Sequence, residues 1–199
     1  MTETAVAIEK EQPVVVIPKR RVLLMTVAEF IAKYARREDG FKYEFVNGKI
    51  EKTPRMIAAD QLYIVDNLQR FFAKTTAYEW GDSLMSEPQA MTSPTKVRAP
   101  DVAYLTKKQM RDLRAGELLL PTFAVEIVSK NDKFKEMREK VVEYFKAGVK
   151  VVWWIVPESE EVHVFTSPTE VKICRGETLC SAEIVIEGFT LSANAIFNK

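Results

Sequence analysis

Two charged residues, Glu126 and Lys140, occupy positions where the sequence pattern calls for apolar side chains. Glu126 lies inside the run from Phe123 to Val128, whose β-branched and aromatic residues are typical of a buried strand. Lys140 follows Met137 by three residues and precedes Tyr144 by four, so it shares the apolar stripe of a predicted helix. A buried carboxylate costs roughly several kcal/mol unless it is paired or bound to a cation. Both charges therefore need partners.

Asp101 is a third candidate, because it follows Pro100 in the short apolar strand from Ala99 to Leu105. Two strands that each carry one carboxylate can bind a divalent cation between them, and hard oxygen ligands suit Mg²⁺ or Mn²⁺. A plain turn residue is the alternative for Asp101, and a salt bridge is the alternative for Glu126. The sequence thus predicts either a metal site or two structural acids.

Lys140 also has more than one interpretation. The helix that carries it follows the Glu126 strand and is expected to pack back over the same sheet, which makes Glu126 the expected partner. This geometry suits a structural ion pair and a catalytic lysine equally. A lysine in such a position can also extend its ammonium to solvent along its apolar stem.

The rest of the chain predicts the elements that position these residues. Thr26 and Glu29 form the pattern of a capping box at the start of a helix over 27–34. Asn47-Gly48 predicts a type I′ hairpin with arms 43–46 and 49–52. A helix over 58–74 is expected to bury an apolar stripe that begins at Leu62. The remaining predictions are a charged helix or loop over 106–115, the strand–helix–strand unit 123–156, strands at 162–165, 170–174 and 184–187, and a short closing helix after Gly188.

This order of elements predicts an α/β (α+β) fold with one domain. Strands alternate with helices in the middle of the chain and pair as hairpins at both ends, which favours a mixed β-sheet flanked by helices, with a central βαβ unit. The 199 residues suit a single domain over 21–199 after a flexible tail over 1–20. The apolar patch 14–17 in that tail is a candidate edge strand or dimer contact.

Composition and missing motifs exclude several other classes. Lys plus Arg is 29 and Asp plus Glu is 28, so bulk charge does not favour a protein that coats nucleic acid; it does not bear on a local basic groove. Cys174 and Cys180 cannot form a zinc site alone and are expected as reduced thiols of a cytoplasmic protein, with a local hairpin disulfide as the alternative. His163 is the only histidine, and there is no phosphate-binding glycine loop. No run is long and apolar enough to cross a membrane.

Five ordered segments of the chain resemble the Uma-type restriction endonucleases of the PD-(D/E)XK nuclease superfamily. The segments are YEFVNGKIEKTP, RAPDVAYL, FAVEIVSKND, REKVVEYFKAGVKVVWWIVP and IEGFTLSANAIF. The resemblance covers the chain from about Val22 to Phe197 and implies a restriction-endonuclease-like fold. It also implies that Asp101 and Glu126 bind Mg²⁺, with Mn²⁺ as a substitute, and that the ion polarises the phosphate and lowers the pKa of the attacking water.

The motif lysine departs from the family pattern. Val128 stands two residues after Glu126, where the motif has lysine. The resemblance places this lysine in the following helix at Lys140, where it would stabilise developing charge or orient the water, and Lys130 is the rival. Glu44 matches the acid of the family hairpin, which implies a further ligand or a supporting contact; an exposed strand acid is the alternative.

Two functions follow from these residues. The first is a metal-dependent DNA endonuclease in which Asp101, Glu126, Lys140 and Glu44 are catalytic. Basic residues that flank the proposed site are candidates to hold DNA phosphates, although a solvated surface explains them equally well; they are Lys96, Arg98, Lys130 and Lys133. The second is a catalytically inactive nuclease-fold protein that binds nucleic acid or serves a structural role, with Glu126 and Lys140 as a buried pair. A homodimer is expected, since the terminal strands offer edges to cover.

Overall fold

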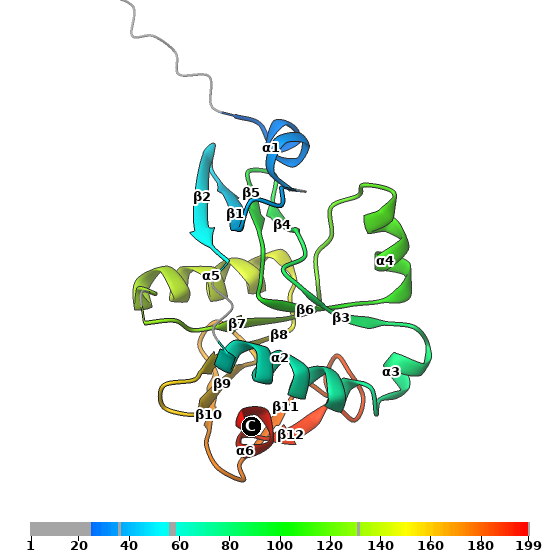
Figure 1. The fold of residues 1–199 in the computed structure, drawn as a ribbon, viewed down its shortest axis with the longest axis vertical. Coiled ribbons are helices and arrows are strands. Elements are labelled where there is room, and N and C mark those ends of the chain that lie inside the picture. The colour runs from blue at the N-terminus through cyan, green and yellow to red at the C-terminus, as the bar shows by residue number, and fades with distance from the viewer. Residues whose placement is uncertain (1–24, 36, 56–58, 131, 199) are drawn as a thin grey trace, which may run out of the picture.

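The computed structural model describes residues 25–35, 37–55, 59–130 and 132–198, which form stacked layers (Figure 1). The apolar patch 14–17 and the tail lie outside the described residues. A central sheet is covered on one face by α2 and α6 and on the other by α5, above which lie a second, smaller sheet and α1 (Figure 1). Among the described residues, no helix has the length and apolar character to cross a membrane.

The central sheet contains the predicted βαβ unit. Within the described residues its strand order is β10-β9-β8-β7-β6-β3. β7 and β8 are parallel, while β6 pairs antiparallel with β7 and β9 pairs antiparallel with β8, so the prediction of a mixed sheet is confirmed. The bounds are β3 (Ser83–Ser86), β6 (Val102–Leu105), β7 (Phe123–Ile127), α5 (Phe134–Ala147), β8 (Val151–Val156), β9 (Glu161–Phe165) and β10 (Val171–Cys174).

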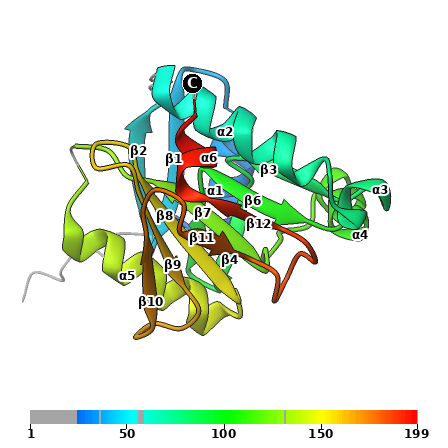
Figure 2. The ribbon, with the colours of Figure 1, turned by 90° about the horizontal axis from the view of Figure 1, so that it is seen from below.

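The larger core lies between this sheet and the helices α2 and α6, which run side by side (Figure 2). The side chains of Phe123, Val125 and Ile127 point from β7 into this core. The side-chain amide of Asn67 in α2 donates to the carbonyl of Ile196 in α6 at 3.1 Å. The elements on this side and at the sheet edge are α2 (Ala59–Phe72), α3 (Thr76–Glu79), α4 (Lys107–Arg114), β11 (Leu179–Ser181), β12 (Thr190–Ser192) and α6 (Ala193–Phe197).

The opposite face of β7 carries Ala124 and Glu126 and lies beneath α5, since side chains alternate along a strand. Met137, Val141 and Tyr144 of α5 pack there. Lys140 lies between them on the same stripe of the helix, as the sequence pattern indicates. Helix α5 therefore presents a lysine to the face of the sheet that bears the carboxylate.

The small sheet has the order β2-β1-β5-β4 among the described residues. Asn47 and Gly48 have φ values of 50° and 84°, the positive pair that a type I′ turn requires, so the hairpin prediction is confirmed. Tyr43 and Phe45 pack beneath α1, which leaves the alternate residues of β1 facing the central sheet. The bounds are α1 (Val27–Tyr34), β1 (Phe41–Val46), β2 (Lys49–Pro54), β4 (Ala90–Ser93) and β5 (Lys96–Arg98).

Two sequence predictions about local structure are wrong. The segment 184–187 forms a turn rather than a strand, because the amides of Val185 and Ile186 both donate to the carbonyl of Ala182. Leu62 is 55% exposed, because α2 buries the row Ile64, Leu68 and Phe72 at a spacing of four residues. Leu62 and Ile184 are apolar residues that tertiary packing leaves at the surface, while Ile186 is buried from within a turn.

Thr26→Ala is expected to lower the free energy of unfolding by about 1 kcal/mol, a typical cost for losing an N-cap side chain. Thr26 Oγ1 accepts from the amide of Glu29 at 3.2 Å, and the Glu29 carboxylate accepts from the amide of Thr26 at 2.8 Å. Urea unfolding measures the change. Thr26→Ser keeps the accepting oxygen and should lose much less; equal losses in both variants would assign the effect to the methyl group instead.

Candidate active site

Asp101 and Glu126 lie opposite each other where β6 begins and β7 ends. Val102 pairs with Val125 in the antiparallel ladder, which places Asp101, one residue earlier, across from Glu126. Asp101 Oδ2 accepts a hydrogen bond from the amide of Ile127 at 2.7 Å, and this bond holds the carboxylate against the end of β7. Glu126 is buried on the α5 face at 3% exposure. The two carboxylates that the sequence singles out are thus brought together.

Lys140 reaches these carboxylates from α5. Its ammonium lies 3.4 Å from Glu126 Oε2 and 3.2 Å from Glu44 Oε1, so the predicted pairing of Lys140 with Glu126 is present. The hydroxyl of Tyr144, one turn later, donates to Glu126 Oε1 at 2.7 Å. Burial and the nearby Glu126 raise the pKa of Tyr144, so this hydroxyl stays protonated as a donor. Glu126 is therefore held by two residues of one helix.

Lys42 is a site residue that the sequence interpretation missed. Its ammonium donates to Asp101 Oδ1 at 2.7 Å, and its side chain is only 14% exposed. Burial lowers the pKa of Lys42, but the charges of Asp101, Glu126 and Glu44 outweigh burial and raise it. The sequence contained a signal for this residue: Lys42 precedes Glu44 by two residues, so the two side chains lie on the same face of β1. The predicted hairpin arm began at Tyr43 and left Lys42 out.

Arg98 anchors Glu44 within a buried ionic network. Glu44 Oε1 accepts from the amide of Ala99 at 2.9 Å, and Glu44 Oε2 accepts from Arg98 Nη1 at 3.1 Å. The other donors of Arg98 bond to Glu143 and Glu51. Glu44 is therefore buried rather than an exposed strand acid. The sequence suggested Arg98 as a phosphate contact. The structure contradicts this, because the side chain is 8% exposed and each guanidinium nitrogen donates to a carboxylate.

Burial and charge act differently on the two buried acids. Burial raises the pKa of Glu126; the charge of Lys140 opposes this rise and the neighbouring Asp101 adds to it, so the pKa stays above its ordinary value. Burial also raises the pKa of Glu44, but the charges of Lys140 and Arg98 outweigh it and hold the pKa below its ordinary value. Of the two acids that contact Lys140, Glu44 thus has the lowered pKa and Glu126 the raised one.

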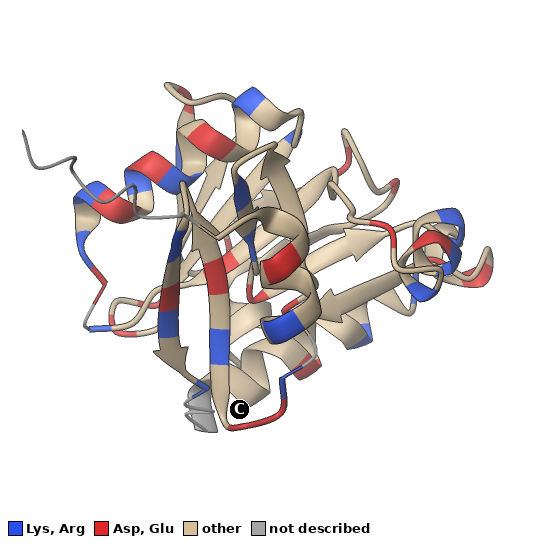
Figure 3. Cartoon of the chain, turned by 90° about the horizontal axis from the view of Figure 1, so that it is seen from above, with Lys and Arg blue, Asp and Glu red and all other residues tan. Residues whose placement is uncertain are grey.

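The remaining predicted lysines lie outside this cluster. Lys130 is 81% exposed and lies 3.8 Å from Glu158, so Lys140, and not Lys130, stands at the carboxylates. Lys133 is also exposed, at the start of α5. Lys96 is partly buried and bonds to an acid of α5. Acidic and basic positions are interspersed along the strands and helices on this side of the molecule (Figure 3).

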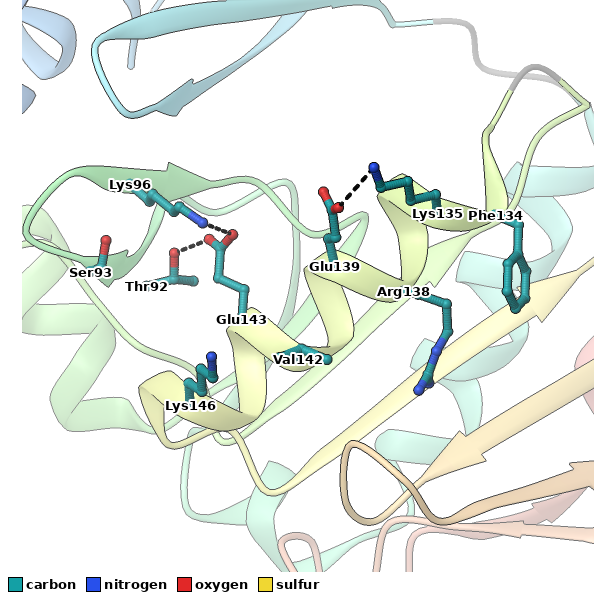
Figure 4. A pocket seen from close by; sticks show the side chains of 10 residues that line it. All are labelled: Thr92, Ser93, Lys96, Phe134, Lys135, Arg138, Glu139, Val142, Glu143 and Lys146. Carbon is teal, nitrogen blue, oxygen red and sulfur yellow. Dashed lines mark hydrogen bonds and ion pairs between the residues drawn. The ribbon is translucent and has the colours of Figure 1, made fainter.

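A groove of about 810 Å³ runs between α5 and the strands β4 and β5 (Figure 4). Phe134, Lys96 and Glu143 are among its lining residues. Glu143 connects the groove to the ionic network, since its carboxylate bonds to Lys96, to the hydroxyl of Thr92 and to Arg98. Asp101, Glu126 and Lys140 are not among the lining residues, so the groove adjoins the carboxylate cluster without containing it.

Glu143→Gln is expected to flatten the loss of stability in acid. Burial raises the pKa of Glu143, but hydrogen bonds from Arg98, Thr92 and Lys96 outweigh it and lower the pKa. A carboxyl whose folded pKa is depressed stabilises the fold above its unfolded pKa, and this stabilisation disappears as the pH falls through the folded pKa. Urea unfolding between about pH 6 and pH 3 should show a shallower decline for the variant. Parallel curves would contradict this role.

The chemistry of the donor set fits a small divalent cation. Mg²⁺ is commonly bound by one or two carboxylates, with waters and substrate phosphates completing its shell, and Asp101 and Glu126 supply such a pair. Carboxylate oxygens have more than one acceptor direction, so a lysine and a cation can share one group. Within the described ranges, no group of three or more His, Cys, Asp or Glu is arranged to hold a metal. Among the residues that the structure describes, Asp101 and Glu126 are the carboxylates that would hold such an ion.

The mixed sheet, the central βαβ unit and the carboxylate pair beside a helical lysine define a restriction-endonuclease-like protein. The family model described as "Putative restriction endonuclease" (Uma2) matches residues 27–194, and the chain belongs to this family. The predicted family and fold are thereby confirmed.

A solved structure shares the same fold. It is the crystal structure of a "putative nuclease belonging to DUF820" from Anabaena variabilis, which is 18% identical in sequence. The match covers 87% of this chain and 97% of that chain with a TM-score of 0.71. At this identity the likeness concerns the fold. No curated protein matches the chain.

Proposed function

We propose that this protein is a metal-dependent endonuclease that hydrolyses phosphodiester bonds of DNA. The observation that carries the proposal is the opposition of Asp101 and Glu126 across the β6–β7 ladder, with a partly buried lysine at each carboxylate. Membership of a family described as restriction endonucleases supports a nuclease and suggests DNA as its substrate. Hydrolysis of a phosphodiester needs electrostatic stabilisation of the charge that develops on the phosphate, and a cation held by this carboxylate pair would supply it.

In this proposal each buried group has a separate task. Asp101 and Glu126 would hold Mg²⁺, which when bound polarises the phosphate and lowers the pKa of the attacking water. Lys140 neutralises charge at Glu126, and Glu44 fixes the position of its ammonium. Lys96, Lys130 and Lys133 are the basic side chains that would position the DNA backbone.

The proposal is tested with supercoiled plasmid DNA, EDTA-treated protein and added Mg²⁺ or Mn²⁺. The wild-type protein should nick or linearise the plasmid only with the cation, and Asp101→Asn should do neither. Calorimetry should detect Mn²⁺ binding to the wild-type protein and not to Asp101→Asn. Asp112→Asn is the matched control, because Asp112 forms only a helical i,i+4 pair with Lys108. Cleavage that survives in Asp101→Asn would contradict the assignment.

An inactive nuclease-fold homodimer is the alternative, and the pairing of both carboxylates with lysines favours it. In that protein the cluster is a set of buried ion pairs, and no heat of Mn²⁺ binding is expected. Val171 and Ile173 on β10, at the edge of the central sheet, expose apolar side chains that a second copy would cover. Light scattering tests the dimer, and a monomer at micromolar concentration would exclude it.

A further inference from the structure

We propose that Lys42 is a second active-site lysine, which contacts a phosphate of bound DNA beside Asp101. The proposal rests on the proposed nuclease function and assigns a DNA contact to a residue that the motif does not include. It also divides the work of the two buried lysines: Lys140 balances the carboxylates, and Lys42 meets the substrate.

The fold delivers Lys42 and Glu44 to the site together. Both lie on the face of β1 opposite Tyr43 and Phe45, whose rings pack against Tyr34 and Phe30 of α1. The hairpin therefore cannot turn Lys42 to solvent without also removing Tyr43 and Phe45 from their core. Its side chain enters the carboxylate cluster from the small sheet, while Lys140 enters from α5.

The two ammonium groups differ in how many donors remain. Lys140 is held between two carboxylates, Glu126 and Glu44. Lys42 has a single carboxylate partner among the described residues, Asp101. An ammonium carries three donors, so Lys42 has two to offer a ligand. Its 14% exposure leaves a route for an incoming phosphate oxygen, whereas the guanidinium of Arg98 has no nitrogen free of carboxylates.

The net charge of the cluster shows why Lys42 matters for binding an anion such as a phosphate. The connected acids Asp101, Glu126, Glu44, Glu51 and Glu143 carry five negative charges when ionised, and Lys42, Lys140, Arg98 and Lys96 carry four positive charges, so the nine groups sum to −1. Removing Lys42 makes the sum −2 and raises the repulsion felt by a phosphate diester. The phosphate and the carboxylates therefore compete for one ammonium, and the free donors of Lys42 allow it to hold both.

The salt dependence of DNA binding tests this contact without requiring cleavage. Lys42→Met and the wild-type protein are titrated into a fluorescein-labelled DNA duplex in EDTA over a series of KCl concentrations. Each lost phosphate contact reduces the slope of log K against log salt by about 0.9. We expect that reduction in Lys42→Met, together with roughly ten-fold weaker binding at low salt. Lys42→Arg should keep the slope.

Two further variants keep the test decisive. Lys49→Met removes the same charge from an exposed position on the same hairpin and should leave the slope unchanged. Lys42→Gln retains a donor for Asp101 but lacks the charge, so it replaces Lys42→Met if that variant fails to fold, and the same reduction is expected. If the wild-type protein binds and cleaves DNA but Lys42→Met and Lys42→Gln give the wild-type slope, the proposal for Lys42 is overturned and the nuclease function stands. A wild-type protein that neither binds nor cleaves DNA would remove the proposed function, and the Lys42 contact with it.

Discussion

Glu126→Gln is expected to reduce metal-dependent cleavage of plasmid DNA by about a hundred- to a thousand-fold, the usual cost of removing one preorganised electrostatic group from a hydrolytic site. The substitution changes one oxygen to a nitrogen and removes the negative charge that the proposed cation needs. Its volume and reach are nearly those of the acid. The rate of conversion of supercoiled plasmid at saturating Mg²⁺ measures the effect.

The fold should survive Glu126→Gln, which makes the result interpretable. Glu126 is the acid whose pKa stays above its ordinary value, mainly because of burial, so its charge is held at a cost in the folded protein. The amide oxygen of glutamine can accept from Lys140, and its NH₂ can donate to the Tyr144 hydroxyl. Lys140 also retains Glu44 at 3.2 Å. The free energy of unfolding should therefore stay close to that of the wild-type protein.

Glu139→Gln is the matched control for cleavage, because Glu139 lies on the same helix, is exposed and pairs only weakly with Lys135 at 3.9 Å. Cleavage by Glu126→Gln at the wild-type rate would show that the buried acid is structural. Equal losses in both variants would show an effect of net charge on DNA binding instead.

Lys140→Met is expected to lower the free energy of unfolding by about 3–5 kcal/mol, the range found when one partner of a buried ion pair is removed. Methionine fills the apolar stem but leaves Glu126 and Glu44 facing each other without the charge between them. Urea unfolding near neutral pH measures the loss. Lys135→Met, an exposed change on the same helix, should stay within about 0.5 kcal/mol of the wild-type protein.

The double variant Lys140→Met/Glu126→Gln identifies the cause of that loss. If the cost is unpaired negative charge, removing the second carboxylate should restore most of the stability. Mild acid should also restore stability to Lys140→Met. The charge of Lys140 lowers the pKa of Glu126, so this pKa rises further when the lysine is absent. The difference in free energy of unfolding between Lys140→Met and the wild-type protein should therefore become smaller as the pH falls and Glu126 binds a proton. A double variant as unstable as Lys140→Met would assign the loss to packing.

Local pattern was enough to predict the elements that carry the chemistry. The apolar run around Glu126 and the helical spacing of Met137, Lys140 and Tyr144 correctly placed the acid and the lysine on facing surfaces. Gly148 at φ 117° correctly marked the end of the helix. These features depend on residues within a few positions of one another, which a sequence shows directly.

Partners supplied by other segments were harder to predict. Burial was predicted wrongly for apolar residues that tertiary packing leaves at the surface, such as Leu62 on α2. The basic residue Arg98 suggested a phosphate contact, yet Glu44, Glu51 and Glu143 from three other segments surround it. Charge type alone does not show whether a side chain meets solvent or a buried acid, because that depends on which strands and helices close over it.

The sequence by itself determined that Glu126 lies inside an apolar strand and that Lys140 lies on the apolar stripe of the helix that follows it, and it predicted Asp101 at the start of another strand. Only the tertiary structure decided that Lys42 joins Asp101 and that Arg98 holds Glu44. The physical reason is distance along the chain: Lys42 meets Asp101 because β1 pairs with β5, which lies about 50 residues later and leads directly into Asp101, and no local pattern shows that pairing.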